Sequence, residues 1–216
     1  MDHVISGVAK FQKEVFPNKK ATFQKLANGQ NPEVLFITCS DSRIDPNLVT
    51  QTDPGELFIC RNAGNIVPPH SNQTGGMTAS IEFAVAALGI SHIVVCGHTD
   101  CGAMKGALNP DQLDSLPHVK EWLGHCRVAT EIVKERCGGA LNHEHLEEVT
   151  KENVVQQIQH LRTHPAVAAK LATNQVTLHG WVYNIGSGEV HCYNPTSGEF
   201  EVMQQDDAEA QLACTS

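Results

Sequence analysis

Apolar residues near the N-terminus recur at helical spacing. They are Val4, Val8, Phe11 and Val15. This spacing predicts a helix over residues 3–16, which Pro17 interrupts because proline lacks the backbone N–H that a helix interior needs. A second helix is expected over about 18–28, and Gly29 marks its end. Together the two helices would form an N-terminal helical arm.

Three short apolar runs follow the arm. They are VLFITC (34–39), LFICRN (57–62) and HIVVCGH (92–98). Each run is rich in β-branched residues, is bounded by turn residues and lacks a clean alternation with polar residues. Strands that are buried on both faces have this composition, so the runs predict a parallel sheet.

The rest of the chain predicts helices and a hairpin. The segment TGGMTASIEFAVAALGI (74–90) has a threonine start, helical apolar spacing and a stop at Gly89, which predicts a crossover helix. Two long helices are expected over about 115–136 and 144–162. The runs VTLHGWVYNI and EVHCYNP are separated by GSG (186–188), which predicts a β-hairpin.

These elements predict an α/β fold. Its centre would be a mostly parallel β-sheet flanked by helices, with the N-terminal helical arm and a C-terminal hairpin. A chain of 216 residues suits one domain, which we expect to cover residues 1–205. Residues 206–216 are expected to be a frayed or disordered tail.

Composition narrows the functional classes. The formal net charge is −9 and no block of lysine or arginine stands out, which argues against nucleic-acid binding. No apolar run approaches the length of a membrane span. The N-terminus shows no basic segment followed by an apolar one, so we expect a cytoplasmic protein, and no segment is an identifiable carboxysome address.

Eight cysteines in an intracellular chain favour metal binding or catalysis for some and plain burial for the others. Cys39 ends the first apolar run, and His98 and Cys101 follow the third run in CGHTDCG. Sites in open α/β sheets form at the carboxyl ends of strands, so these three side chains are expected to converge. One histidine and two cysteines suit zinc, and three ligands leave a fourth position open, as in catalytic sites.

The motif CSDSR adds a carboxylate and a guanidinium. In an extended segment, Asp41 and Arg43 would face the same side as Cys39. The ion pair would keep Asp41 ionised, so that it could accept the proton of a zinc-bound hydroxide. Asp45 and Pro46 then predict a helix start.

The segment after His98 predicts a second helix start. Cys101 would lie at that helix N-terminus, where a thiol is more easily deprotonated. Gly102 would let the backbone lie close to a small substrate.

Each motif alone also has an ordinary interpretation. CxDxR is about as often an incidental strand-end turn as a site, and HxxC alone is more often not a metal site; the two together favour zinc. The cysteines expected in the core are Cys60, Cys96 and Cys192, and those without a pattern are Cys126, Cys137 and Cys214. The histidines of NHEHLEE (142–148), with His160 and His164, are expected on polar helix faces.

The motifs CSDSR, RNAGN and GHTDCGAMKG stand in the order and spacing of the β-class carbonic anhydrases. The chain resembles the bacterial, cyanobacterial and plastid branch of that family from residue 3 to about 202. The resemblance implies a lyase with one Zn²⁺ per subunit that interconverts CO2 and bicarbonate by attack of a metal-bound hydroxide. It also implies a homodimer, often assembled further, in which the N-terminal helices embrace the partner.

The resemblance also assigns residues to roles. Cys39, His98 and Cys101 match the zinc ligands, and Asp41 and Arg43 match the catalytic pair. Because two thiolates offset the charge of the ion, we expect activity to rise toward mildly alkaline pH.

Further residues match a substrate pocket that the family shares across the dimer interface. Gln30 matches a glutamine whose amide faces substrate, and Phe58 matches an aromatic wall. Phe83 falls where many relatives have tyrosine, so its wall lacks that hydroxyl.

Some family members close the site by moving the aspartate onto zinc, with bicarbonate held nearby. A tryptophan three residues before the first zinc cysteine helps to hold that bicarbonate, and here Phe36 stands in its place. Phe36 has no N–H to donate, which leaves Arg61 as the remaining donor. We therefore expect an open site, with Asp41 bound to Arg43 rather than to zinc.

Three alternatives remain open at this point. Hydrolysis of CS2 or COS would use the same hydroxide behind a narrower entrance. A zinc-bearing scaffold without activity would not need Asp41 and Arg43. Thiol redox chemistry ranks last, because the chain has no CxxC motif.

Overall fold

The computed structural model describes residues 1–71 and 74–204. A six-stranded sheet with the order β2-β1-β3-β4-β5-β6 forms its centre. The strands are β1 (Val34–Cys39), β2 (Leu57–Asn62), β3 (His92–His98), β4 (Thr177–Tyr183), β5 (Val190–Asn194) and β6 (Glu199–Val202). Strands β1 to β4 are parallel, and β5 and β6 add antiparallel pairs. The predicted α/β fold, its mostly parallel sheet and its hairpin are confirmed.

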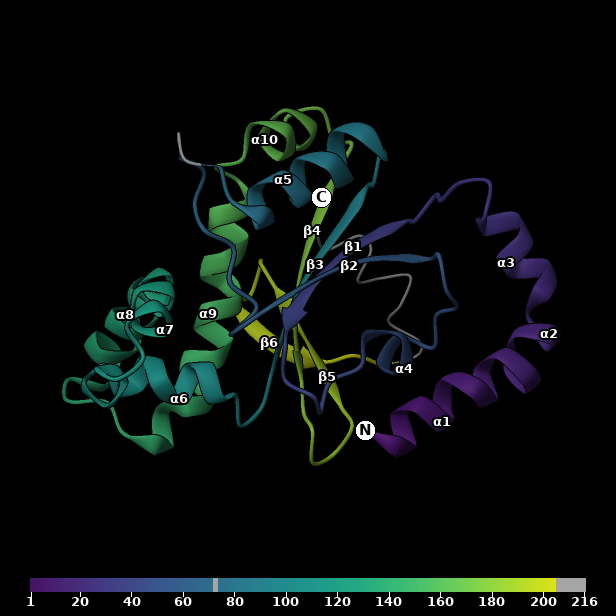
Figure 1. The fold of residues 1–216 in the computed structure, drawn as a ribbon. Helices are drawn as coiled ribbons and strands as arrows, with labels where there is room; N and C mark the ends of the chain where they lie inside the picture. Colours follow the sequence, from purple (N-terminus) through teal and green to yellow (C-terminus); the bar gives the residue numbers. More distant parts are fainter. Residues whose placement is uncertain (72–73, 205–216) are drawn as a thin grey trace.

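Helices lie on both faces of this sheet (Figure 1). They are α1 (Asp2–Lys10), α2 (Phe16–Asn18), α3 (Lys20–Leu26), α4 (Pro46–Thr50), α5 (Gly76–Glu82), α6 (Gly102–Leu108), α7 (Pro117–Leu123), α8 (Arg127–Cys137), α9 (Leu146–Leu161) and α10 (Pro165–Leu171). Figure 1 shows α5, α9 and α10 on one face and α4 on the other, with the arm α1–α3 extending away from the sheet.

The two faces of the sheet carry different cores, because side chains alternate along a strand. Leu35 and Ile37 of β1 point into the larger core under α5, α9 and α10. Phe36 points to the opposite face, where its ring meets that of Trp181 at 5.9 Å. Burial on both faces explains the continuous apolar run that predicted this strand.

The N-terminal arm departs from the prediction at Pro17. The helix passes Pro17 and ends at Asn18, because the preceding turn, Phe11–Val15, is π-helical. A proline in the first turn of the next segment needs no N–H bond, so the chain continues without a break. The side chains of α1 are all exposed.

Two other helix predictions need correction, and two elements were missed. The crossover helix begins at Gly76 rather than Thr74, and its last turns are π-helical up to Ala87. The helix expected over about 115–136 is divided by a 3-10 turn, Gly124–Cys126. Helix α10 and the short exposed strand β6 were not predicted, because both have few buried residues to mark them.

No helix in the two described stretches is long and apolar enough to cross a membrane. The predicted tail, residues 206–216, lies outside the described residues, and the single domain over 1–205 and the cytoplasmic location stay predictions.

The contact between β4 and α9 has a simple test in Gly180→Ala. A Cβ atom at Gly180 would lie 2.8 Å from Ile158 Cδ1 and 3.0 Å from Val154 Cγ1. We expect the free energy of unfolding in urea to fall by about 1–3 kcal/mol, the usual effect of overpacking. Gly139→Ala is the control, since a Cβ there meets nothing within 4 Å. Equal stability of the two variants would contradict this packing.

Candidate metal and active site

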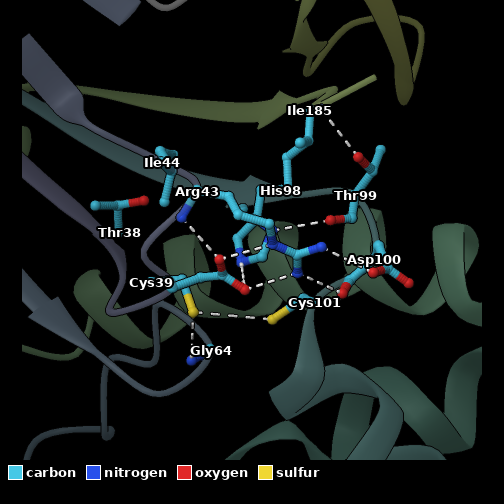
Figure 2. A network of polar contacts seen from close by, with 12 residues as sticks. Thr38, Cys39, Arg43, Ile44, Gly64, His98, Thr99, Asp100, Cys101 and Ile185 are labelled. Atoms are coloured by element: carbon cyan, nitrogen blue, oxygen red, sulfur yellow. Dashed lines mark hydrogen bonds and ion pairs between the residues drawn. The ribbon is translucent and has the colours of Figure 1, made fainter. Parts of the chain in front are cut away.

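The carboxyl ends of β1 and β3 bring Cys39 next to His98. The strands pair in parallel, with Thr38 opposite Cys96, so the residues that follow emerge at the same edge of the sheet. Cys101 is the N-cap residue just before α6 and points back to the same place (Figure 2). The ligand atoms of Cys39, His98 and Cys101 all lie within 4.8 Å of one another, and the three residues are buried. The predicted convergence of these side chains is therefore present.

The donor atoms of this cluster fit a zinc ion. Thr99 O lies 2.9 Å from His98 Nδ1 and accepts a hydrogen bond from its N–H, which leaves Nε2 with a free lone pair. Nε2 is fully buried without a hydrogen-bond partner among the described residues, a costly state unless a cation binds it. The two Sγ atoms are 3.9 Å apart, close to the roughly 3.8 Å of two thiolates on tetrahedral zinc.

The two thiols differ in acidity. With Cys39 as the thiolate, Cys101 donates the hydrogen bond between them, and this bond lowers the pKa of Cys39 to about 4 against the opposing effect of burial. The same neighbour raises the pKa of Cys101 far above its usual range. A second thiolate so near is repelled, while the backbone N–H groups of Ala103 and Met104 at the start of α6 lower the pKa of Cys101, as a helix N-terminus should. An easily deprotonated Cys101 stays a prediction. A divalent cation would reverse the upward shift.

Asp41 and Arg43 form a bidentate pair, although the backbone between them is a turn rather than the extended segment expected. Arg43 Nε donates to Asp41 Oδ1 at 2.9 Å and Nη2 donates to Oδ2 at 2.8 Å. The Arg43 N–H also donates to Asp41 Oδ1 at 3.0 Å, the short-range bond that favours aspartate in turns. These bonds hold the pKa of Asp41 well below its usual range. Asp41 Oδ2 lies 3.8 Å from His98 Nε2, beside the cluster.

Asp100 is a member of the site that sequence reasoning missed. Arg43 Nη1 donates to Asp100 Oδ2 at 2.9 Å and Nη2 donates to Asp100 O at 3.1 Å. Lys105 forms an ion pair with the same carboxylate and, with Arg43, lowers the pKa of Asp100 to about 2. The guanidinium is thus fixed from both sides. The only signal for Asp100 in the sequence was its place between His98 and Cys101.

A carbonic anhydrase family model matches residues 34–190. The chain belongs to the carbonic anhydrase family. The carbonic anhydrase of Synechococcus elongatus is 46% identical over 200 residues, which cover 92% of this chain and 74% of that protein.

Two solved structures place the chain in the β class of carbonic anhydrases, and the chain is therefore an enzyme of this class. One is the β-carbonic anhydrase CcaA, with a TM-score of 0.91, 41% identity and coverage of 94% of this chain and 99% of the other. The second belongs to a study of two tetrameric β-carbonic anhydrases from Sordaria macrospora, with a TM-score of 0.78, 31% identity and coverage of 88% and 95%.

In this β-carbonic anhydrase, Arg61 binds backbone carbonyls beside the cluster, and the anion binding considered above stays a prediction. Its Nε donates to Cys39 O at 2.9 Å, and its Nη2 donates to Asp41 O at 2.7 Å and Ile44 O at 2.9 Å. These bonds hold the loop that carries the Asp41–Arg43 pair. Phe36 packs in the core and offers no donor.

The residues matched to the shared pocket of the anhydrases lie far from Cys39 in the single chain. Phe58 lies opposite Leu35 in the sheet, and Leu35 precedes Cys39 by four residues, or about 13 Å along β1. Its ring is 6.1 Å from that of Phe83, whose side chain is 48% exposed. Gln30 lies before β1, in a groove lined also by residues of the arm. One chain therefore does not bring these three residues to the cluster.

Gly102 lies at the start of α6 beside the cluster. A Cβ atom there would meet nothing within 4 Å, so packing within the chain does not require glycine. Its predicted role in letting substrate approach the backbone stays a prediction.

Replacing Cys39 by serine tests the ligand set. We expect Cys39→Ser to weaken zinc binding by more than the roughly 10- to 100-fold that outer-shell changes cost, because a thiolate ligand is lost. Metal content after dialysis against a graded chelator measures this. Cys137→Ser is the matched control, since its thiol is exposed at the end of α8. Equal zinc retention by both variants would remove Cys39 from the ligand set.

Proposed function

We propose that this enzyme catalyses the reversible hydration of CO2 to bicarbonate and a proton, with one zinc ion per subunit. The observation that carries the proposal is the position of an ionised, fixed carboxylate, Asp41, beside the buried Cys39–His98–Cys101 donor set. A structural zinc site does not need such a carboxylate. The family membership supports the same reaction.

The three donors have complementary parts in this proposal. Cys39, His98 and Cys101 would hold the ion and leave one position open. When bound, zinc supplies a Lewis acid that makes water nucleophilic near neutral pH. The Thr99 carbonyl fixes the His98 ring with Nε2 toward the ion, as outer-shell partners of metal-bound histidines do.

Asp41 directs the nucleophilic oxygen. Arg43 occupies both carboxylate oxygens and keeps the group ionised, so Asp41 can only accept a hydrogen bond. An acceptor beside the open coordination position would orient the proton that remains on the activated water, and a lone pair of that water's oxygen would then face CO2. Asp100 and Lys105 keep Arg43 in place from the other side. This arrangement favours the open site, with Asp41 on Arg43.

Hydration of CO2 measured by stopped flow across pH, with metal analysis of the same sample, tests the proposal. We expect kcat/KM to rise from about pH 6 to about pH 9, the range in which zinc makes water reactive. Asp41 does not contribute to this rise, because its lowered pKa keeps it ionised throughout. Arg43→Ala should lower kcat/KM by about 10- to 100-fold with zinc retained. Arg127→Ala, an exposed arginine at the start of α8, is the control.

Each other outcome has a definite meaning. A background rate with stoichiometric zinc would show a zinc-bearing scaffold instead. Turnover of CS2 or COS without hydration of CO2 would show the related hydrolase. Unchanged kinetics in Arg43→Ala would remove that residue from the mechanism.

We also infer that the enzyme is a homodimer with shared active sites. The arm exposes apolar side chains, among them Val4, Ile5 and Val8, which a partner subunit would cover. Phe58 and Gln30 lie far from their own Cys39, which is what a pocket completed by a second chain requires. Relatives described as tetrameric agree with assembly of this kind.

Mixing two inactive variants tests the shared site. One chain carries Arg43→Ala and the other carries Gln30→Ala with Phe58→Ala. In the mixed dimer, the site with intact Arg43 receives intact Gln30 and Phe58 from its partner. Unfolding and refolding the mixture should recover about one quarter of the wild-type rate, since random pairing leaves one site in four intact. No recovery, with dimers present by sedimentation, would place all these residues in one chain's site.

A further inference from the structure

One peptide unit connects helix α7 to the thiolate of Cys39. It consists of the carbonyl of Ala63 and the N–H of Gly64. The N–H donates to Cys39 Sγ at 3.4 Å, as Figure 2 shows. At the other end of the same unit, the indole Nε1–H of Trp122 donates to Ala63 O at 2.9 Å. Indole, peptide and sulfur thus form a continuous chain of hydrogen bonds.

The next peptide unit is fixed by buried side chains of α9. Asn153 Nδ2 donates to Gly64 O at 3.1 Å, and Gln157 Nε2 donates to Asn153 Oδ1 at 2.9 Å. The chain ends at Val67, whose N–H donates to Gln157 Oε1 at 2.8 Å. Asn153 and Gln157 are almost completely buried. These bonds leave the loop little freedom to move.

Glycine is required at position 64 for two reasons. Its φ is +82°, in the region that favours glycine, and a Cβ atom there would lie 3.0 Å from both Ala103 Cβ and Met104 Cε. The N–H is therefore held against Cys39 by conformation, by packing and by its partners on α7 and α9.

A bond from Trp122 to the carbonyl strengthens the N–H bond at the other end of the peptide. Hydrogen bonds in series polarise one another, by about 10–30% per bond. An N–H that donates to a thiolate withdraws negative charge from sulfur, and such bonds tune metal centres. In this site the effect matters because two thiolates offset the charge of a divalent ion, and any charge withdrawn leaves the ion a stronger Lewis acid.

We propose that Trp122 is a positioning residue, which acts through the Ala63–Gly64 peptide to limit the charge that Cys39 donates to the bound metal. The inference rests on the proposed zinc-dependent function. The indole of Trp122 reaches the Cys39 donor atom through this peptide. Its contribution is to the electronic character of the site.

Trp122→Phe tests this with cobalt in place of zinc. Phenylalanine keeps an aromatic ring for the edge-on contact with His125, which is 5.6 Å between ring centroids in the wild type, and removes the indole donor together with one ring of the side chain. We expect the thiolate-to-cobalt charge-transfer band to move to lower energy, since a more electron-rich sulfur gives up charge more easily. In the zinc enzyme, the midpoint of kcat/KM against pH should move to more alkaline values, with a loss of up to about 10-fold at pH 7.

Trp181→Phe is the matched control, because the chain has two tryptophans and Trp181 packs on Phe36. The control should leave both the band and the midpoint unshifted, whatever its melting temperature. A band and a midpoint in Trp122→Phe equal to those of the wild type would overturn the proposal. A lowered melting temperature without either shift would assign Trp122 a purely structural role, which also overturns it.

The same experiment separates this inference from the proposed function. A wild-type protein that binds cobalt but does not hydrate CO2 would refute the proposed reaction, while the band in Trp122→Phe would still report on Cys39. If Trp122→Phe does not fold, growth of the Trp181→Phe chain with β-(3-benzothienyl)alanine replaces the one remaining indole. That analogue keeps the shape of tryptophan and lacks the N–H, so the same band shift is expected.

Discussion

Parallel pairing of β1 with β3 is the constraint from which the site follows. The two strands lie next to each other and run in the same direction, so Cys39 and His98 leave the sheet at the same edge. With antiparallel pairing the two residues would lie at opposite ends of the strands. Side chains of β1 and β3 are buried in a separate hydrophobic core on each face of the sheet. This burial fixes the register, because a slip by one residue would move every side chain of a strand to the opposite face.

The site formed at this edge is held mainly through the backbone. Arg61 binds the carbonyl of Cys39 at the end of β1 and two carbonyls of the loop that follows, and Asn153 with Trp122 binds two carbonyls of the loop after β2. Fixed loops let the side chains that meet the metal and CO2 be oriented before either is present, which is the usual source of precision in catalytic sites.

Charge is balanced within the same few residues. Asp41 and Asp100 share the guanidinium of Arg43, and Lys105 compensates the second carboxylate. Cys39 and Cys101 have no such cation among the described residues, and their opposite pKa shifts reflect this. A divalent ion would complete the balance, and it would also satisfy the buried His98 Nε2.

Local signals in the sequence determined the strands, the helix start after Asp45 and the places of Cys39, His98 and Cys101 at or just after strand ends, because each depends on neighbours in the chain. The convergence of the three was expected from the general rule that sites form at the carboxyl ends of parallel strands. Asp45 caps α4 through Asn47 N and Leu48 N, as its sequence context predicted. Only the tertiary structure decided the turn between Asp41 and Arg43, the role of Asp100 and the contacts of Arg61 and Trp122. Those depend on partners such as Ala63, which is 59 positions from Trp122, and no periodicity reports a hydrogen bond to a distant carbonyl. The part of Gln30, Phe58 and Phe83 in a pocket depends on the proposed pairing of two chains. Within one chain, the length of the strands keeps these residues away from Cys39.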